Sequence, residues 1–461
     1  MMSSASKTNS AALAFIVCGA LWFVYGTLNG AVTAMHLVAP EFFNNIAFFV
    51  FGRARPVHVN TVIFGFIVST LIGCALYYVP ALLRTRLWSE KLGWAACLLW
   101  QATVLSGTIT FPMGISQGRE YAEYIWPFDV CVVGALLLLI VNAVMTVVNR
   151  VEKSLYVSVW YVFGTLLWTA GVYPIGNVMW HPATGAMPGI LDEIFLWFYG
   201  HNLVGLLITP LAVGAAYFVM PRITRTPLYS HTLSLVGFFA LVAIYTHIGG
   251  HHLLQADIPN WLKTVSVVDS IAMIIPVFTV LANLWLTTRG RFGALWHDVP
   301  GRFVLIGSIW YLVTCVQGPI QSLPSIQTVT HFTQWTVGHA HIAVLGFAGF
   351  IALGTTWHVL PLIVKKQVYS WPLVRLQFGL LLIGIIGFFV VLTTAGLIQG
   401  HAWRRGTAGY NVLQDLRPYF VLRLMTGISI IVAAFLGLYT MLMTLFCGKP
   451  LEDAAQEVQP L

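Results

Sequence analysis

Residues 331–361 read HFTQWTVGHAHIAVLGFAGFIALGTTWHVLP, a polar opening with two closely spaced histidines followed by a long, uncharged and mostly apolar run. A helix that crosses a lipid bilayer needs roughly 20 consecutive apolar residues. The stretch therefore predicts a transmembrane helix that carries His339 and His341 near one of its ends.

The rest of the chain repeats this pattern. Of its 461 residues, 58% are hydrophobic and only 8% are charged, whereas soluble domains are about 25% charged. A water-soluble enzyme and a disordered chain are both excluded, and the unbroken runs do not alternate as β-barrel strands do. We expect an all-α polytopic membrane protein, a single domain over residues 1–461, with twelve transmembrane helices. Their centres fall within 11–39, 59–83, 92–112, 127–148, 154–176, 194–219, 231–253, 264–287, 302–322, 334–361, 372–399 and 418–446.

Charge and cysteine usage predict the orientation and exclude some partners. With both termini on one side, fifteen of the 23 Lys and Arg residues fall on that side and eight on the other. The positive-inside rule then places both termini in the cytoplasm, and the polar segment Met1–Ser10 has no cleavage site. The basic balance gives no indication of nucleic acid. The six cysteines are scattered singly, so no c-type haem motif is present.

The histidines carry the chemistry. Ionisable groups inside a membrane are costly and indicate functional sites. Because successive helices alternate in direction, six histidines from four helices fall in one layer near the outer side. They are His58, His201, His251, His252, His339 and His341. Six other histidines are read as packing or hydrogen-bonding residues: His36, His181, His247, His331, His358 and His401.

The spacing of these histidines indicates two kinds of site. Each helical residue turns about 100°, so His339 and His341 point in nearly opposite directions and serve different sites. Adjacent His251 and His252, with His201, form a three-imidazole set that suits copper or another borderline first-row metal. His58 with one of the tenth-helix histidines would make a six-coordinate haem, and the other histidine would hold a five-coordinate haem facing the metal.

The arrangement resembles the haem–copper oxygen reductases, and more closely the catalytic subunit of cbb3-type cytochrome c oxidases. Six stretches carry the resemblance, in the order of that family: RPVHVNTVIF (55–64), REYAEYIWPFD (119–129), WFYGHN (197–202), YTHIGGHH (245–252), HFTQWTVGHAH (331–341) and GLIQGHAWR (396–404). It implies a haem–copper oxidase-like bundle in a bacterial inner membrane. The implied activity is reduction of dioxygen to water, coupled to proton translocation.

The resemblance also assigns ligands. His201, His251 and His252 would bind the copper CuB, and His339 would be the axial ligand of the high-spin haem b3. His58 and His341 would hold the low-spin haem b. Electrons would come from cytochrome c through separate, membrane-anchored c-type cytochrome subunits.

Tyr245 and Gln317 bear on the choice between reactions. Tyr245 lies seven residues before His252, which in a continuous helix places it within about 20° of the same face. By resemblance it matches the tyrosine that cbb3-type enzymes link covalently to a copper-ligand histidine, here His201, and nitric oxide reductases lack it. Gln317, in VQGP, stands where the family has a glutamate. Because an amide cannot exchange a proton as a carboxylic acid does, proton delivery at this point is in doubt.

Further residues are assigned by their position. A proton route of hydroxyl groups and water is expected from Tyr229 past Ser234 toward Tyr245, with Asn283 nearby. By resemblance, Glu120 would belong to a calcium site between the haems, while two arginines in the outer layer could neutralise haem propionates. These arginines are Arg404 and Arg405.

Two other functions compete with the oxidase. A nitric oxide reductase would hold iron in the three-histidine site and would not need Tyr245. A haem-binding transporter or sensor would leave the cluster of His201, His251 and His252 unexplained. A plain solute transporter fits less well, because its binding site belongs at the midplane.

Overall fold

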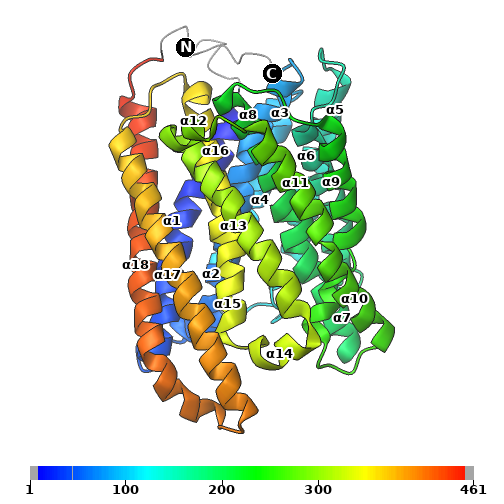
Figure 1. Cartoon of the computed structure of the whole chain (residues 1–461), viewed down its shortest axis with the longest axis vertical. Coiled ribbons are helices and arrows are strands. Elements are labelled where there is room, and N and C mark those ends of the chain that lie inside the picture. Colours follow the sequence, from blue (N-terminus) through cyan, green and yellow to red (C-terminus); the bar gives the residue numbers. More distant parts are fainter. Residues whose placement is uncertain (1–8, 44, 452–461) are drawn as a thin grey trace.

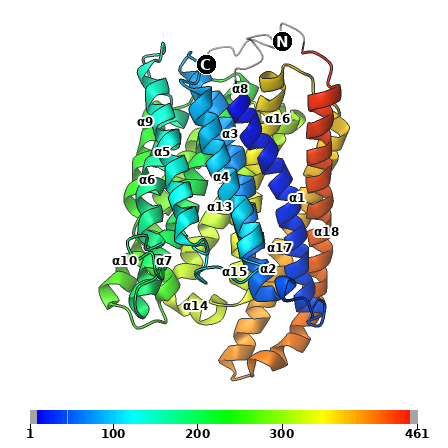
Figure 2. The same ribbon diagram turned by 180° about the vertical axis from the view of Figure 1, so that it is seen from behind.

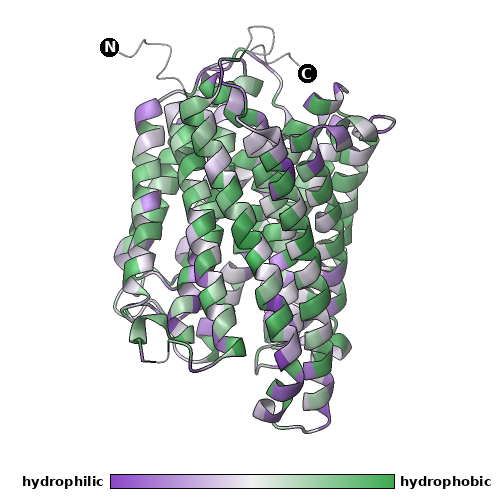
Figure 3. Ribbon diagram, turned by 90° about the vertical axis from the view of Figure 1, so that its left-hand side faces the viewer, coloured by the Kyte–Doolittle hydropathy of each residue, from purple (hydrophilic) through white to green (hydrophobic). Residues whose placement is uncertain are grey.

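The computed structural model describes residues 9–43 and 45–451, so most of the polar segment before the first predicted helix lies outside the described residues. The described residues form a bundle of long, nearly parallel helices and contain no strand (Figure 1). Hydrophobic residues cover the middle of the bundle and hydrophilic ones gather toward its ends (Figure 3). Helices satisfy their own backbone hydrogen bonds, as the bilayer core requires. The predicted fold class is confirmed.

The elements follow one another along the chain with short connections. The helices are α1 (Ser10–Val38), α2 (Phe51–Asn60), α3 (Ser69–Leu82), α4 (Glu90–Thr110), α5 (Trp126–Val148), α6 (Val157–Gly176), α7 (Ile190–Asn202), α8 (Thr209–Thr224), α9 (His231–Tyr245), α10 (Asn260–Ala272), α11 (Ile274–Thr287), α12 (Phe292–His297), α13 (Val299–Ser322), α14 (Pro324–Thr330), α15 (Gln334–His341), α16 (Phe350–Val364), α17 (Trp371–Arg404) and α18 (Gly409–Cys447). Two 3-10 helices, η2 (Ala47–Phe49) and η5 (Ile248–Leu253), and three π-helices, η3 (Thr61–Val68), η4 (Leu203–Ile208) and η6 (Ile342–Gly349), complete the set.

Eleven continuous helical spans within the described residues are long and apolar enough to cross a membrane. Some join several elements, such as α15, η6 and α16 in Gln334–Val364. The twelfth predicted crossing is α6, whose 20 residues include tryptophans, tyrosines and a proline and which is not among these eleven spans. It lies beside α5 in the bundle (Figures 1 and 2). The predicted ends differ most at the start of α18, which begins at Gly409 and not at 418, and at the start of the second span, which begins at Phe51 and not at 59. Helix α17 also continues past the predicted limit at residue 399.

Three long spans share one internal pattern. In each, a π-helical segment lies between two helical halves, a proline follows, and a basic residue with a left-handed backbone stands just past the helix end. As names for positions in the fold, we call the end of the bundle at these basic residues inner and the opposite end outer. These residues are Pro80 with Arg84 (φ 51°), Pro221 with Arg225 (φ 53°), and Pro361 with Lys365 (φ 54°). A single left-handed residue is a common way to end a helix. The next helix then starts with a serine N-cap, at Ser89, Ser230 and Ser370.

This threefold pattern explains why the histidines lie at one depth. His58 and His339 each precede the proline of their repeat by 22 residues, and His201 and His341 precede theirs by 20. The π-helical segments begin within three residues of His58, His201 and His341. π-helical segments are frequent at functional sites. The ligand-bearing positions are therefore equivalent places on three similar spans.

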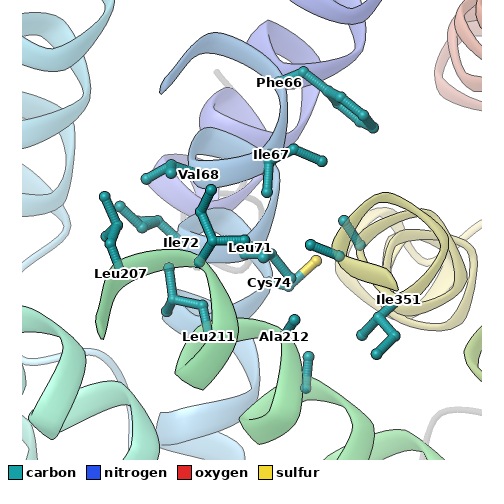
Figure 4. Packing of buried hydrophobic residues seen from close by; sticks show 14 of the residues in the cluster. Phe66, Ile67, Val68, Leu71, Ile72, Cys74, Leu207, Leu211, Ala212 and Ile351 are labelled. Atoms are coloured by element: carbon teal, nitrogen blue, oxygen red, sulfur yellow. The ribbon is translucent and has the colours of Figure 1, made fainter. Parts of the chain in front are cut away.

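The inner half of the bundle is packed solid where these spans meet. Figure 4 shows side chains of η3 and α3, such as Leu71, against Leu211 of α8 and Ile351 of α16. These three side chains are almost completely buried, and such close packing fixes the spacing of the helices. The outer half instead encloses a cavity.

Candidate functional site

Three histidines converge at the outer end of the bundle. His201 comes from the end of α7, while His251 and His252 come from η5. One ring nitrogen from each lies within 4.8 Å of the others, and Nδ1 of His201 is 3.0 Å from Nε2 of His252. Among the described residues, this is the only group of three or more His, Cys, Asp or Glu residues placed to hold a metal ion.

Neighbouring side chains orient these rings. Ser270 Oγ donates to the Ser266 carbonyl (2.6 Å), so it accepts from the Nδ1–H of His251 (2.7 Å). That tautomer leaves Nε2 of His251 unprotonated and available as a ligand. The His252 ring is stacked on Trp197, with ring centroids 4.0 Å apart and an interplanar angle of 12°. The rings are therefore held in place by the protein.

Tyr245 lies beside the three-histidine cluster, but not as helical spacing predicted. Helix α9 ends at Tyr245, and a tight 3-10 segment carries His251 and His252, so the argument from a common helical face was wrong. Gly249 and Gly250 stand in this segment. Tyr245 is stacked instead on His201, with centroids 4.9 Å apart and an interplanar angle of 18°. Gly205 makes room for it, since a Cβ there would lie 1.6 Å from the tyrosine ring.

A second site pairs His58 with His341. Their ring centroids are 6.4 Å apart and their planes differ by 21°. Nδ1 of His58 donates to the Gly26 carbonyl, and Nδ1 of His341 donates to the Val337 carbonyl, each at 2.7 Å. Carbonyl oxygens only accept, so both rings have Nε2 free to bind a metal. Of the two alternatives left open by spacing, the structure pairs His58 with His341.

His339 points to a different place from His341. Its Nδ1 donates to Oε1 of Gln317 on α13 at 2.9 Å. The amide that replaces the family glutamate is therefore in direct contact with the predicted ligand of haem b3. It lies on the side of His339 opposite its free Nε2, so its first role is to hold this imidazole.

One cavity connects all these groups. It has a volume of about 580 Å³, within the range of roughly 300–1,000 Å³ typical of cofactor sites. Its lining is mostly apolar and includes the six histidines, Tyr245, Arg55, Glu120 and Arg423. Arg404 and Arg405 lie exposed at the end of α17 and are not part of this lining. The structure therefore does not bring these two arginines to the site.

Polar residues close the outer end of the cavity. Glu120 forms an ion pair with Arg55, so its carboxylate already has a cationic partner. The buried Glu123 accepts from Asn60 Nδ2 at 3.0 Å. Its burial raises the pKa of the Glu123 carboxyl to about 7, although the hydrogen bond from Asn60 opposes the shift.

The residues of the expected proton route hold helices together at the inner side. Asn283 accepts from the Ser230 amide (3.0 Å) and donates to its carbonyl (2.8 Å), while Ser234 donates to the His231 carbonyl. Tyr229 is exposed, and its amide donates to Thr287. Asn142 makes the same two bonds to Ser89 in another repeat, far from the cavity. A structural role accounts for these bonds of Asn283.

Sequence reasoning missed several cavity residues. His331 was read as a packing residue, yet it lines the cavity and its Nδ1 has no hydrogen-bond partner among the described atoms. Tyr311 and Cys315 line the cavity near Tyr245, and Asn283 Nδ2 lies 3.4 Å from the hydroxyl of Tyr217. Phenol side chains within apolar runs were the signal that could have found Tyr217 and Tyr311.

The donor sets fit haem and a first-row metal. A metal–imidazole bond is roughly 2.0–2.1 Å long, so two such bonds plus two ring radii come to about 6 Å, close to the observed separation of His58 and His341. The nearly parallel ring planes suit two axial ligands of one macrocycle. Three neutral imidazoles suit copper, zinc or iron, and the residues alone do not choose among them.

Comparisons with known proteins agree over nearly the whole chain. The family model described as Cytochrome C and Quinol oxidase polypeptide I matches residues 10–449. The "Cbb3-type cytochrome c oxidase subunit CcoN1" of Stutzerimonas stutzeri is 29% identical over 458 residues, which covers 96% of each chain. The "Cytochrome c oxidase subunit 1 homolog" of Agrobacterium tumefaciens (strain T37) is 30% identical over 460 residues, covering 96% of this chain and 85% of the relative. A cryo-EM structure of a heme-copper terminal oxidase dimer shares the fold, with a TM-score of 0.76, 18% identity and coverage of 100% of this chain and 88% of that one.

Proposed function

The chain belongs to the cytochrome c and quinol oxidase polypeptide I family, and from that premise we propose that it is the catalytic subunit of a terminal respiratory oxidase. The reaction is the reduction of dioxygen to water with electrons from cytochrome c. The observation that carries the proposal is the stacking of Tyr245 on His201, next to His251 and His252. A phenol at this position can give both an electron and a proton where an O–O bond must break.

Each cofactor has its own set of side chains. His58 and His341 would hold the low-spin haem b, His339 the high-spin haem b3, and the three-histidine cluster the copper. When bound, these groups would carry the electrons that cytochrome c supplies and would provide the redox chemistry of dioxygen reduction. Arg55 and Arg423 line the same cavity, and the Nε of Arg423 has no hydrogen-bond partner among the described atoms. They would neutralise the haem propionates, a role that Arg404 and Arg405 are not placed to fill.

The protein contributes orientation, exclusion of water and proton handling. Ser270 and Trp197 fix the rings of His251 and His252, and second-shell contacts of this kind tune metal affinity. The apolar lining keeps water away from the reacting groups. The hydroxyl of Tyr245 holds the proton that the reaction needs at the cluster.

Protons would reach Tyr245 from the inner side of the membrane. Asn283 contacts the Tyr217 hydroxyl, and Tyr311 and Cys315 line the cavity next to Tyr245. This series supports a route of hydroxyl groups and water that starts near Tyr229 and Ser234. Coupling of the reaction to proton translocation is part of the proposal.

The proposal extends to location and partners. The chain would lie in a bacterial inner membrane with both termini in the cytoplasm, since its Lys and Arg residues favour that side. Electrons would come from cytochrome c through membrane-anchored c-type cytochrome subunits, because the chain has no c-type haem motif. A calcium ion at Glu120 stays a prediction, with the ion pair to Arg55 as its competitor.

Metal analysis of the purified complex tests the assignment of the three-histidine site. An oxidase should contain one copper per chain, and His251→Ala should lose the copper while keeping the spectrum of the low-spin haem. A nitric oxide reductase should contain one extra iron and no copper. A haem-binding sensor or transporter should contain neither metal in this site, and it would turn over neither gas.

A further inference from the structure

The 3-10 segment η5, which carries two of the three ligands in the three-histidine cluster, is held from two sides. On one side it packs closely on α10, where a Cβ on Gly250 would lie 2.3 Å from Ser266 Oγ. Ser270, also on α10, accepts a hydrogen bond from the His251 ring. On the other side the contact comes from the short helix α14, through the side chain of Gln327.

The Gln327 amide bonds twice to the far end of η5. Its Nε2 donates to the backbone carbonyl of His251 at 2.7 Å, and its Oε1 accepts from Nε2 of Gln255 at 3.1 Å. Because a carbonyl oxygen only accepts, the first bond fixes which way the amide points. Gln255 stands two residues beyond the end of η5 and is exposed. Gln327 is buried and lines the cavity, so its amide joins the cavity wall to the metal-binding segment.

Helix α14 is itself firmly placed. It lies across the outer end of the bundle, between α15 and α10 (Figures 1 and 2). Its backbone is pressed against α17, where a Cβ on Gly400 would lie 1.8 Å from the carbonyl oxygen of Val329. Only glycine allows so close an approach of two backbones. The bonds of Gln327 therefore tie η5 to a fixed part of the fold.

The chain runs from α14 straight into α15, the helix that carries His339. The joint between them is stiff, because Thr333 Oγ1 donates to the Thr330 carbonyl at 2.7 Å and accepts from the Trp335 amide at 3.3 Å, as an N-cap does. His339 follows Gln327 by twelve residues and lines the same cavity as the three-histidine cluster. One short, rigid stretch of chain thus contacts η5 at one end and carries His339 at the other.

We propose that Gln327 is a positioning residue for the reduction of dioxygen, which sets where the three-histidine cluster stands relative to His339. The amide acts through the His251 carbonyl and does not need to touch the gas. Rates depend steeply on such placement, since a misplacement of about 1 Å can cost about 100-fold. The inference rests on the proposed oxidase function and adds the residue that holds the two halves of its reaction site in register.

Gln327→Met tests the inference in the purified complex, because methionine is also unbranched and removes both hydrogen bonds. Oxygen uptake should fall about 10–100-fold through misplacement of the reacting groups. Copper content should stay unchanged, because the three imidazoles and Ser270 remain. Gln101→Met is the matched control: this glutamine bonds to Trp22 and Ser69 and is not part of the cavity lining, so its loss should leave oxygen uptake unchanged.

Carbon monoxide distinguishes positioning from a merely structural role. It binds a reduced high-spin haem, a flash of light releases it, and the rate of its return depends on what stands opposite the haem. Gln327→Met should change this rate and spread it over several phases, since η5 is no longer held at one distance. If Gln327→Met lowers the melting temperature but leaves the rate of return as in the unaltered complex, the residue only stabilises the fold and the proposal is overturned.

A surface variant covers the case in which Gln327→Met does not fold. Gln255→Met changes an exposed residue and removes only the bond to Oε1 of Gln327. It should change the rate of carbon monoxide return by a smaller factor than full loss of the amide would. Where Gln327→Met is not folded, an unchanged rate in Gln255→Met overturns the proposal.

Oxygen uptake by the unaltered complex separates this inference from the function beneath it. If the unaltered complex takes up no oxygen with any donor, the proposed function fails and this inference fails with it. If the unaltered complex takes up oxygen and Gln327→Met does so at the same rate, with the same return of carbon monoxide, the inference alone fails.

Discussion

The two-histidine and three-histidine sites lie in the same cavity but are built differently. His58 and His341 each bind a backbone carbonyl through Nδ1, and their rings stand apart at 6.4 Å. The three-histidine cluster brings its ring nitrogens within 4.8 Å and is supported by side chains, namely Ser270, Trp197 and Tyr245. One site is held by the main chain, and the other by groups that a single mutation can remove.

This difference matches two tasks. A metal that only passes electrons benefits from a complete set of immobile ligands, since no substrate has to bind to it or leave it. A site that binds a gas needs an open position, together with protons and hydrogen bonds that can be tuned. Substitutions around the second site should therefore alter chemistry, while those around the first should alter mainly the presence of its cofactor.

Removing one ligand from each site should have the largest effect and tests whether the two sites are independent of each other. His251→Ala should abolish oxygen uptake and the metal of the three-histidine site, yet leave the low-spin spectrum intact. His341→Ala should abolish the low-spin spectrum and leave that metal in place. Metal analysis and optical spectra measure both outcomes, and loss of both cofactors in either variant would contradict the separation of the sites.

Removing a supporting side chain should have a smaller effect. Ser270→Ala takes away the acceptor for Nδ1 of His251, and second-shell losses of this kind typically weaken metal binding about 10–100-fold. Titration with a copper chelator measures the affinity. Ser429→Ala serves as the control, because this serine bonds to the Leu380 carbonyl and is not part of the cavity lining. Equal affinities in both variants would refute the supporting role.

Gln317 offers a finer test of the same kind. In Gln317→Glu, an ionised carboxylate would accept the Nδ1–H bond of His339 more strongly than the amide does. The imidazole would then donate more electron density to the iron, which should lower the reduction potential of the high-spin haem by several tens of millivolts. A shift of 59 mV changes a one-electron equilibrium constant tenfold. Redox titration reads the potential. An unchanged potential would show that the contact only positions the ring.

The smallest effect concerns a carboxyl group that supports the two-histidine helix. Glu123 bonds to Asn60, two residues after His58, and burial raises its pKa from 4.5 to about 7. Between these values the folded state binds more protons than the unfolded state, so stability should fall as pH rises from about 4.5 to 7. The full penalty, about 3 kcal/mol at most, is present above pH 7.

Thermal melting at pH 5.5 and pH 8 measures this dependence. Glu123→Gln should reduce the difference in melting temperature between the two pH values. Glu41→Gln, which changes an exposed carboxylate, should leave that difference unchanged. If Glu123→Gln melts with the same pH dependence as the unaltered chain, the raised pKa is not the cause.

Much of this architecture could be predicted from the sequence. Long apolar runs predict membrane helices, because the bilayer core offers the backbone no hydrogen-bond partner outside the helix. The helical bundle could therefore be predicted. The resemblance to cbb3-type oxidases was confirmed by the relatives. The histidine layer followed from alternating helix directions. The pairing of His58 with His341 could not be read from spacing, because it depends on how two distant spans are rotated.

Other features depended on local departures from ideal helices. The face assigned to Tyr245 assumed a continuous α-helix, but the chain tightens into a 3-10 segment at Gly249 and Gly250. The residues between the predicted helices 372–399 and 418–446 were expected to form a connection, but α17 continues to Arg404 and α18 already begins at Gly409. Arg423 and His331 were missed because a lone polar residue in an apolar stretch does not reveal what it faces.

The most direct test of the central claim is gas consumption by the purified complex with a reduced donor, followed with electrodes for dioxygen and for nitric oxide. The account predicts rapid oxygen uptake that falls about 10²–10⁴-fold in Tyr245→Phe, as expected when an essential proton donor is removed, with both haem spectra retained. Nitric oxide uptake without oxygen uptake, unchanged in Tyr245→Phe, would contradict it and would assign iron to the three-histidine site.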